Sequence, residues 1–221
     1  MPRRAIDRFL IYSLLWLGPM FAIWYLLAPK LLLPIALLTQ FVLTQGFGHA
    51  VVAVEQHGIA VEIVTRFLIA APAGSSLPPG AHGQLVFEIN ALKYAYGLPL
   101  LVALTLAAPT AIGDKLTRAI VGVVMLLPVP VWGLACEALK VLVFEMGPTL
   151  ANQMHTTALA RELLAFAYQL GYLILPAVTP ILIWAALHRG FLRVLLGAAQ
   201  TPGGAPGTSD ANGRSTTGTL L

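Results

Sequence analysis

A thiol, an imidazole and a guanidinium occur near one another in the chain, at Cys136, His155 and Arg161. Positive charge beside a cysteine stabilises its thiolate, so this set could form the nucleophile of a membrane cysteine peptidase or transpeptidase. However, Cys136 lies within a long apolar segment, where a lone cysteine is typical of a small space-filling side chain. We therefore predict no catalytic residue and keep the three as candidates for an alternative, enzymatic function.

Glu137 and Lys140 are charged residues in the same apolar segment. Side chains three residues apart share one face of a helix, so we expect these two to pair with each other or to contact a partner. Ionisable groups at membrane depth also mark ion and proton pathways, which leaves a small transporter subunit as a further alternative.

Three histidines and three glutamates occur between residues 49 and 88: His49, His57, His82, Glu55, Glu62 and Glu88. Their spacing matches no zinc motif, and we expect no metal. Glu55, Glu62 and Arg66 are instead expected on a water-facing surface, as candidates for partner binding. The chain also has no glycine-rich phosphate loop and no GxSxG motif, so we expect no cofactor.

The composition of the 221-residue chain excludes several classes of protein. Hydrophobic residues make up 58% and charged residues only 10%, against about 25% charged in soluble domains. A water-soluble enzyme is therefore excluded. The net charge of +4 includes no run of basic residues, so we expect no nucleic acid as a partner. The composition predicts an integral membrane protein in contact with the lipid bilayer.

Four apolar segments are predicted to cross the membrane: residues 9–28, 94–108, 119–144 and 163–187. A fifth apolar segment, residues 31–48, carries a polar stripe at helical spacing. Basic clusters occur at residues 3–8, 115–118 and 189–193, and the positive-inside rule assigns all three to the cytoplasm. This requires an even number of crossings between successive clusters, which the four predicted crossings satisfy, and it assigns both termini to the cytoplasm. Residues 31–48 are therefore predicted to form a re-entrant or interfacial helix on the outer face.

Between the first and second crossings the pattern changes to that of a sheet. Residues 51–56, 59–67 and 85–89 alternate or are rich in β-branched residues, with Gly58 at a turn. We predict a small three-stranded antiparallel sheet outside the membrane. The fold class is thus a mainly α-helical multi-pass membrane protein. Its membrane domain would cover residues 1–196, with the β insertion at residues 49–91, and residues 197–221 would form a disordered tail.

Short motifs along the chain resemble those of the exosortase H-associated membrane proteins, which are small bacterial proteins encoded beside an exosortase. The motifs are Phe21 to Tyr25 with Pro29, Val54 to Gly58, Val64 to Arg66, Leu139-Lys140, Gly147-Pro148, Tyr168 to Gly171 and Leu175-Pro176. The resemblance covers the chain up to about residue 197. It implies an accessory of a protein-sorting system in the bacterial inner membrane, and it implies no catalytic residues.

Taken together, these features predict a non-catalytic accessory that assists an exosortase or its exported substrates. An exposed strand edge can bind an extended peptide through main-chain hydrogen bonds. We expect the strand at residues 59–67 to offer such an edge, beside residues 31–48.

Overall fold

The computed structural model describes residues 2–70, 82–146 and 156–193. The elements in chain order are α1 (Pro2–Phe47), β1 (Val51–His57), β2 (Ala60–Ala70), β3 (His82–Asn90), α2 (Leu92–Ala95), α3 (Gly97–Ala107), α4 (Ile112–Leu126), α5 (Pro128–Lys140), η1 (Val141–Glu145), α7 (Ala158–Gln169), η2 (Leu170–Ile174) and α8 (Leu175–Leu187). The protein is therefore mostly helical with one small sheet, as the sequence predicts. The tail predicted at residues 197–221 lies outside the described residues.

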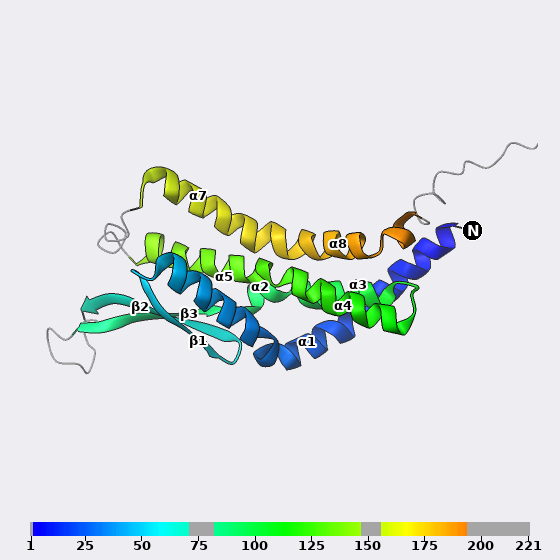
Figure 1. Ribbon diagram of the computed structural model, residues 1–221, viewed down its shortest axis with the longest axis horizontal. Helices are drawn as coiled ribbons and strands as arrows, with labels where there is room; N and C mark the ends of the chain where they lie inside the picture. The colour runs from blue at the N-terminus through cyan, green and yellow to red at the C-terminus, as the bar shows by residue number, and fades with distance from the viewer. Residues whose placement is uncertain (1, 71–81, 147–155, 194–221) are drawn as a thin grey trace, which may run out of the picture.

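Helix α1 is one continuous element of 46 residues, although the sequence suggested two. Pro19, Pro29 and Pro34 lie inside it. Each proline removes a backbone hydrogen bond and favours a bend, but the leucine- and alanine-rich sequence on both sides continues the helix. Figure 1 shows α1 running along the molecule with a bend near its middle. The prediction of a separate re-entrant or interfacial helix at residues 31–48 is therefore wrong, because these residues extend α1.

Among the described residues, three helical stretches are long and apolar enough to cross a membrane: Ile6–Phe47, Ile112–Glu145 and Ala158–Leu187. They contain the crossings predicted at residues 9–28, 119–144 and 163–187. The segment predicted at residues 94–108 falls in a shorter apolar helix, Leu92–Ala107, formed by α2 and α3. Helix α5 continues into the π-helical turn η1, and α7 continues into η2; such turns often mark functional regions.

The helices lie side by side along the long axis of the molecule (Figure 1). Helix α3 packs against α1, α4 and α8 in one half, whereas α5 packs against α1 and α7 in the other. The sheet lies in this second half, with β1 against α1. The start of α1 and the end of α8 lie together at the end of the molecule opposite to the sheet.

The sheet has the order β1-β2-β3, with both pairs antiparallel. Gly58, at φ +65°, forms the turn between β1 and β2, a conformation that glycine adopts at little cost. Val61 and Ile63 are fully buried on one face, while Arg66 is exposed on the other. Because β2 is the central strand, both of its edges are paired. The prediction that residues 59–67 offer an edge is therefore wrong; the edge strands are β1 and β3.

Candidate functional site

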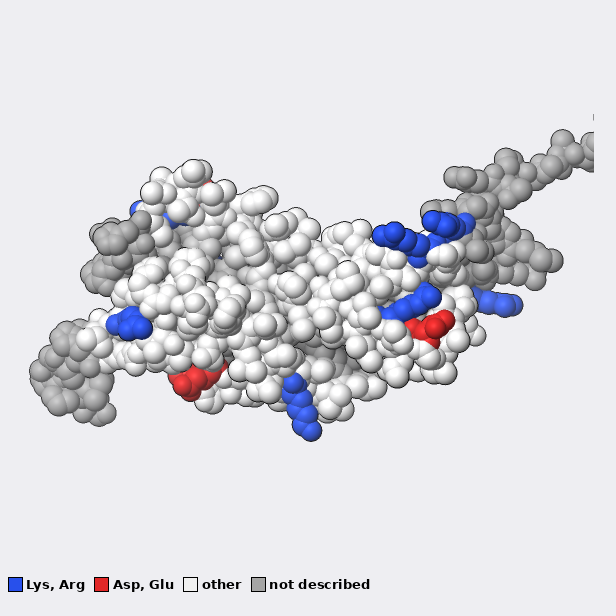
Figure 2. All heavy atoms as spheres, viewed as in Figure 1, with Lys and Arg blue, Asp and Glu red and all other residues white. Residues whose placement is uncertain are grey.

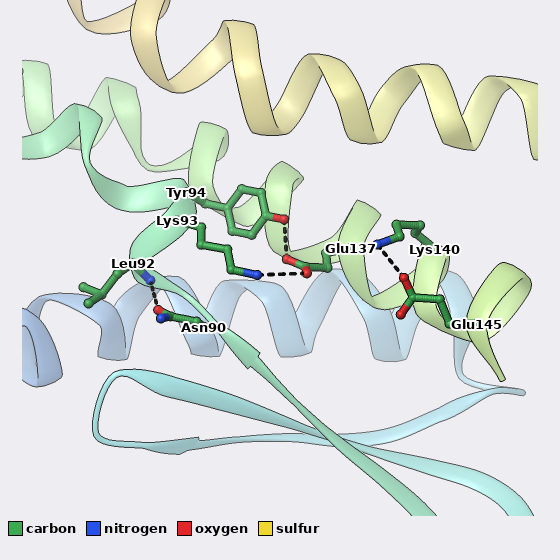
Figure 3. A network of polar contacts seen from close by, with 7 residues as sticks. All are labelled: Asn90, Leu92, Lys93, Tyr94, Glu137, Lys140 and Glu145. Atoms are coloured by element: carbon green, nitrogen blue, oxygen red, sulfur yellow. Dashed lines mark hydrogen bonds and ion pairs between the residues drawn. The ribbon is translucent and has the colours of Figure 1, made fainter.

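Glu137 on α5 is a carboxylate with only 7% of its surface exposed. The Tyr94 hydroxyl donates a hydrogen bond to Oε2 of Glu137, and Nζ of Lys93 lies 3.5 Å from Oε1 (Figure 3). Both partners belong to α2, so the network joins two distant parts of the chain. A buried charge without a partner is costly, which explains why both carboxylate oxygens have partners.

Gly133 makes room for this network one turn before Glu137. A Cβ atom at position 133 would overlap the ring of Tyr94. On η2, a Cβ at Gly171 would lie 3.2 Å from Cα of Gly133 and 2.9 Å from Cδ1 of Trp132. The two glycines therefore allow α5 to approach both α2 and η2 closely, as small residues do between membrane helices.

The sequence suggested that Lys140 could pair with Glu137, because the two residues share one face of α5. In the structure Lys140 pairs with a different residue. Its Nζ lies 2.7 Å from Oε1 of Glu145 and 4.6 Å from the centroid of the Tyr168 ring. The ring of Tyr168 stacks on that of Tyr172 at 5.9 Å. The reason is spatial: Lys93 from α2 occupies one side of Glu137, and η1 brings Glu145 close to Lys140 (Figure 3).

We name Lys93, Tyr94, Glu137, Lys140 and Tyr168 the Glu137 cluster. Two pockets border it. One, of about 300 Å³, is lined by Lys93, Tyr96, Tyr172 and Leu173. The other, of about 250 Å³, is lined by Lys140, Phe144, Ala165, Tyr168 and Gln169. Ammonium groups and phenol rings beside apolar surface suit the binding of a polar group of a partner. Sequence reasoning missed the roles of Tyr94 and Tyr168 because residue spacing along one helix does not reveal contacts between helices.

The charged residues of the sheet lie on its exposed face. Glu55 is opposite Glu62 in the β1–β2 register, and Glu62 is opposite Glu88 in the β2–β3 register. Nδ1 of His57 lies 3.4 Å from Oε2 of Glu62. Carboxylates facing one another across strands are unfavourable, so this row makes no contribution to the stability of the sheet. In the described part of the chain, no group of three or more His, Cys, Asp or Glu could hold a metal ion.

The sequence profile of the exosortase H-associated membrane proteins matches residues 3–191. This chain belongs to that family. The match spans the chain from the first turn of α1 to just beyond α8. No curated protein and no solved structure matches the chain.

In this exosortase H-associated protein, residues of the short motifs hold the sheet to α1. Nε2 of Gln56 donates to the carbonyl of Pro29, at 2.6 Å, and to that of Gly58, at 2.8 Å. Nε of Arg66 donates to the carbonyl of Gly48 at 2.7 Å, just beyond the end of α1, where a cation is favourable. Arg66, predicted as a partner-binding candidate, thus also has a structural contact of its own.

Cys136 lies on α5 in apolar surroundings. It lines a pocket of about 480 Å³ between α1, α5 and α7, together with apolar side chains such as Val42, Leu139 and Leu163. Arg161 is exposed in the first turn of α7 and does not line this pocket. His155 lies outside the described residues. The enzymatic alternative based on Cys136, His155 and Arg161 therefore stays a hypothesis.

Proposed function

We propose that this protein is a non-catalytic accessory of a bacterial exosortase-type sorting system. Four crossings anchor it in the inner membrane with both termini in the cytoplasm, and residues 49–91 form an insertion outside. Its sheet-bearing half contacts the exosortase or the exported proteins that the enzyme processes. The observation that carries this proposal is the length of the helical bundle, which exceeds the thickness of a bilayer and leaves apolar side chains exposed beyond it.

Polar residues on or just beyond the three long helices support a level for the bilayer. Three residue pairs are each about 20 residues apart: Arg8 and Lys30, Arg118 and Lys140, and Tyr168 and Arg189. At 1.5 Å per residue this spacing is about 30 Å, the thickness of the hydrocarbon core. The Glu137 cluster would then lie at the outer membrane surface, where tyrosine and lysine are typical.

The orientation follows from the basic residues. Figure 2 shows Lys and Arg side chains gathered at the end of the molecule that carries the start of α1 and the end of α8. The positive-inside rule favours the cytoplasm for this end. The sheet, at the opposite end, would then lie outside the cytoplasm, where exported proteins emerge.

The outer half exposes apolar side chains beyond the level of the hydrocarbon core. Beyond Lys30, α1 extends by about 25 Å and exposes Leu37 and Phe41, at 58% and 63%. Across the apolar pocket that contains Cys136, α7 exposes Leu163 and Phe166, at 58% and 64%. Apolar patches of this kind outside a membrane mark protein–protein contacts. The exposed faces of α1 and α7 on either side of this pocket are therefore the proposed contact surface.

Co-purification with the exosortase tests this surface. We expect Leu163→Gln combined with Phe166→Gln to reduce co-purification in mild detergent at least fivefold, because both side chains would lose apolar burial against the partner. Leu68→Gln is the matched control, because Leu68 is equally exposed at 68% but lies on the sheet. We expect it to leave co-purification unchanged.

Two outcomes would contradict the proposal. Co-purification that is equal in the double variant and the wild type would remove the α1–α7 surface from the contact. Loss of substrate processing in Cys136→Ala, with the protein still abundant in the membrane, would instead favour the cysteine peptidase. We expect Cys136→Ala to process substrates normally, because alanine conserves the apolar surroundings of this position.

A further inference from the structure

A pocket of about 300 Å³ lies at the basic end of the molecule, away from the sheet. It is lined by Arg8, Phe9, Tyr12, Ala107, Pro109 and Phe191. These residues come from the first turns of α1, from the end of α3 and the loop after it, and from the segment after α8. The pocket therefore forms only when three distant parts of the chain are packed together.

Aromatic contacts hold the apolar part of this pocket in place. The ring of Phe9 stacks on Trp184 at 5.0 Å and meets Phe191 edge-on at 5.5 Å. Arg8 and Tyr12 are four residues apart on α1, so both project from one side of that helix. Both are exposed, Tyr12 at 52%. The pocket thus combines a guanidinium and a phenol hydroxyl with a fixed apolar surface.

Two neighbouring cations already have partners in the fold, which distinguishes them from Arg8. Nζ of Lys115 donates to the carbonyl of Leu106 at 2.6 Å, near the end of α3. A terminal guanidinium nitrogen of Arg118 donates to the carbonyl of Leu187 at 3.0 Å, at the end of α8. Both contacts stabilise helix C-termini. Within residues 6–68, 83–146 and 156–193, the ion pairs are His57–Glu62, Lys93–Glu137 and Lys140–Glu145, and none includes Arg8.

We propose that this pocket binds the headgroup phosphate of an anionic phospholipid from the cytoplasmic leaflet. The Arg8 guanidinium presents parallel N–H donors that match two phosphate oxygens, and the Tyr12 hydroxyl donates to a third. Phe9, Phe191 and the neighbouring alanine and proline contact the glycerol and the first acyl carbons. The proposal rests on the membrane level given above, at which Arg8 marks the cytoplasmic surface.

A lipid fits this pocket better than free phosphate because the lining is amphipathic. Inorganic phosphate would satisfy the guanidinium and the hydroxyl but would leave the apolar surface of Phe9 and Phe191 in water. Phosphatidylcholine would fill the apolar surface, but its choline cation would offset the charge of the phosphate near Arg8. Phosphatidylglycerol supplies a net negative charge and acyl chains together.

Thermal unfolding of the purified full-length protein in neutral detergent tests this inference. We expect phosphatidylglycerol to raise the unfolding midpoint in a saturable way, and phosphatidylcholine and inorganic phosphate to leave it nearly unchanged. In Arg8→Gln, the concentration of phosphatidylglycerol that gives half of the shift should rise at least tenfold. Arg193→Gln is the matched control, because Arg193 is exposed near the end of α8 but does not line the pocket. It should respond as the wild type does.

Three results would overturn the proposal. The first is that Arg8→Gln and the wild type need the same phosphatidylglycerol concentration for half of the shift. The second is that Arg193→Gln weakens the response to this lipid as much as Arg8→Gln does. The third is that inorganic phosphate alone gives the full shift of the unfolding midpoint. If Arg8→Gln is unfolded without lipid, Tyr12→Phe is measured in its place. A threefold or greater rise in the phosphatidylglycerol concentration at half of the shift supports the site, and an unchanged concentration contradicts it. The assay contains no exosortase, so its result is independent of the proposed sorting function.

Discussion

Glu137 shows how a single charged side chain can be placed in an apolar bundle. Its carboxylate accepts a hydrogen bond from Tyr94 and lies near Lys93, so neither oxygen is left without a partner. The Lys93 ammonium is about half exposed, which weakens its ion pair through the solvent. Most of the benefit of this arrangement therefore comes from the buried hydrogen bond with Tyr94.

At this residue, Glu137→Ala is expected to lower the free energy of unfolding by about 1–3 kcal/mol, because the buried Tyr94 hydroxyl loses its acceptor. The exposed Glu145 provides the control, and Glu145→Ala should cost no more than about 1 kcal/mol. Unfolding in detergent, followed by tryptophan fluorescence, measures both. Equal losses of unfolding free energy in the two variants would show that the burial of Glu137 does not increase the effect of its substitution.

At the scale of elements, the contacts between helices depend on glycines as much as on large apolar side chains. Gly133 receives the ring of Tyr94, and Gly97 approaches the backbone of Pro176, where a Cβ would lie 2.7 Å from the carbonyl oxygen. These close contacts fix α2 against α5 and α3 against α8. The Glu137 cluster is therefore a consequence of helix packing and not of one helix alone.

The surroundings of the glycines predict opposite effects on stability for two Gly→Ala substitutions. Gly133→Ala should destabilise the protein by about 1–3 kcal/mol, because the added methyl group overlaps the Tyr94 ring. Gly113→Ala on α4, where a Cβ meets no atom within 4 Å, should be neutral or stabilise by up to about 1 kcal/mol. Unfolding midpoints in detergent compare the two. Destabilisation of similar size at both positions would contradict the packing argument.

At the scale of the whole molecule, the two ends differ in chemistry. One end carries the basic residues Arg8, Lys115, Arg118, Arg189 and Arg193, and the other carries the sheet, in which glutamates face one another across the strands (Figure 1). Helix α1 connects the two ends without interruption. The same helix would thus serve as a membrane anchor over its first half and as support for the sheet over its second half.

Labelling of single cysteines tests the orientation. In a Cys136→Ala background, Glu88→Cys on β3 should react with a membrane-impermeant maleimide in spheroplasts, whereas Arg193→Cys should react only after the cells are lysed. Both positions are exposed, so access of the reagent is comparable. Reaction at position 193 but not at position 88 in intact spheroplasts would reverse the proposed topology.

The sequence by itself determined the class of the protein, the positions of its apolar helices, the three strands and the family. The class, the helices and the strands depend on composition or on the period of neighbouring residues, which are local properties of the chain, whereas short motifs indicated the family. Tertiary structure decided the rest. Prolines mark bends but do not show whether a helix ends, so the continuity of α1 had to be observed. The pairing of Glu137 with α2, and of Lys140 with η1, depends on which helices meet, and residue spacing within one helix carries no information about that choice.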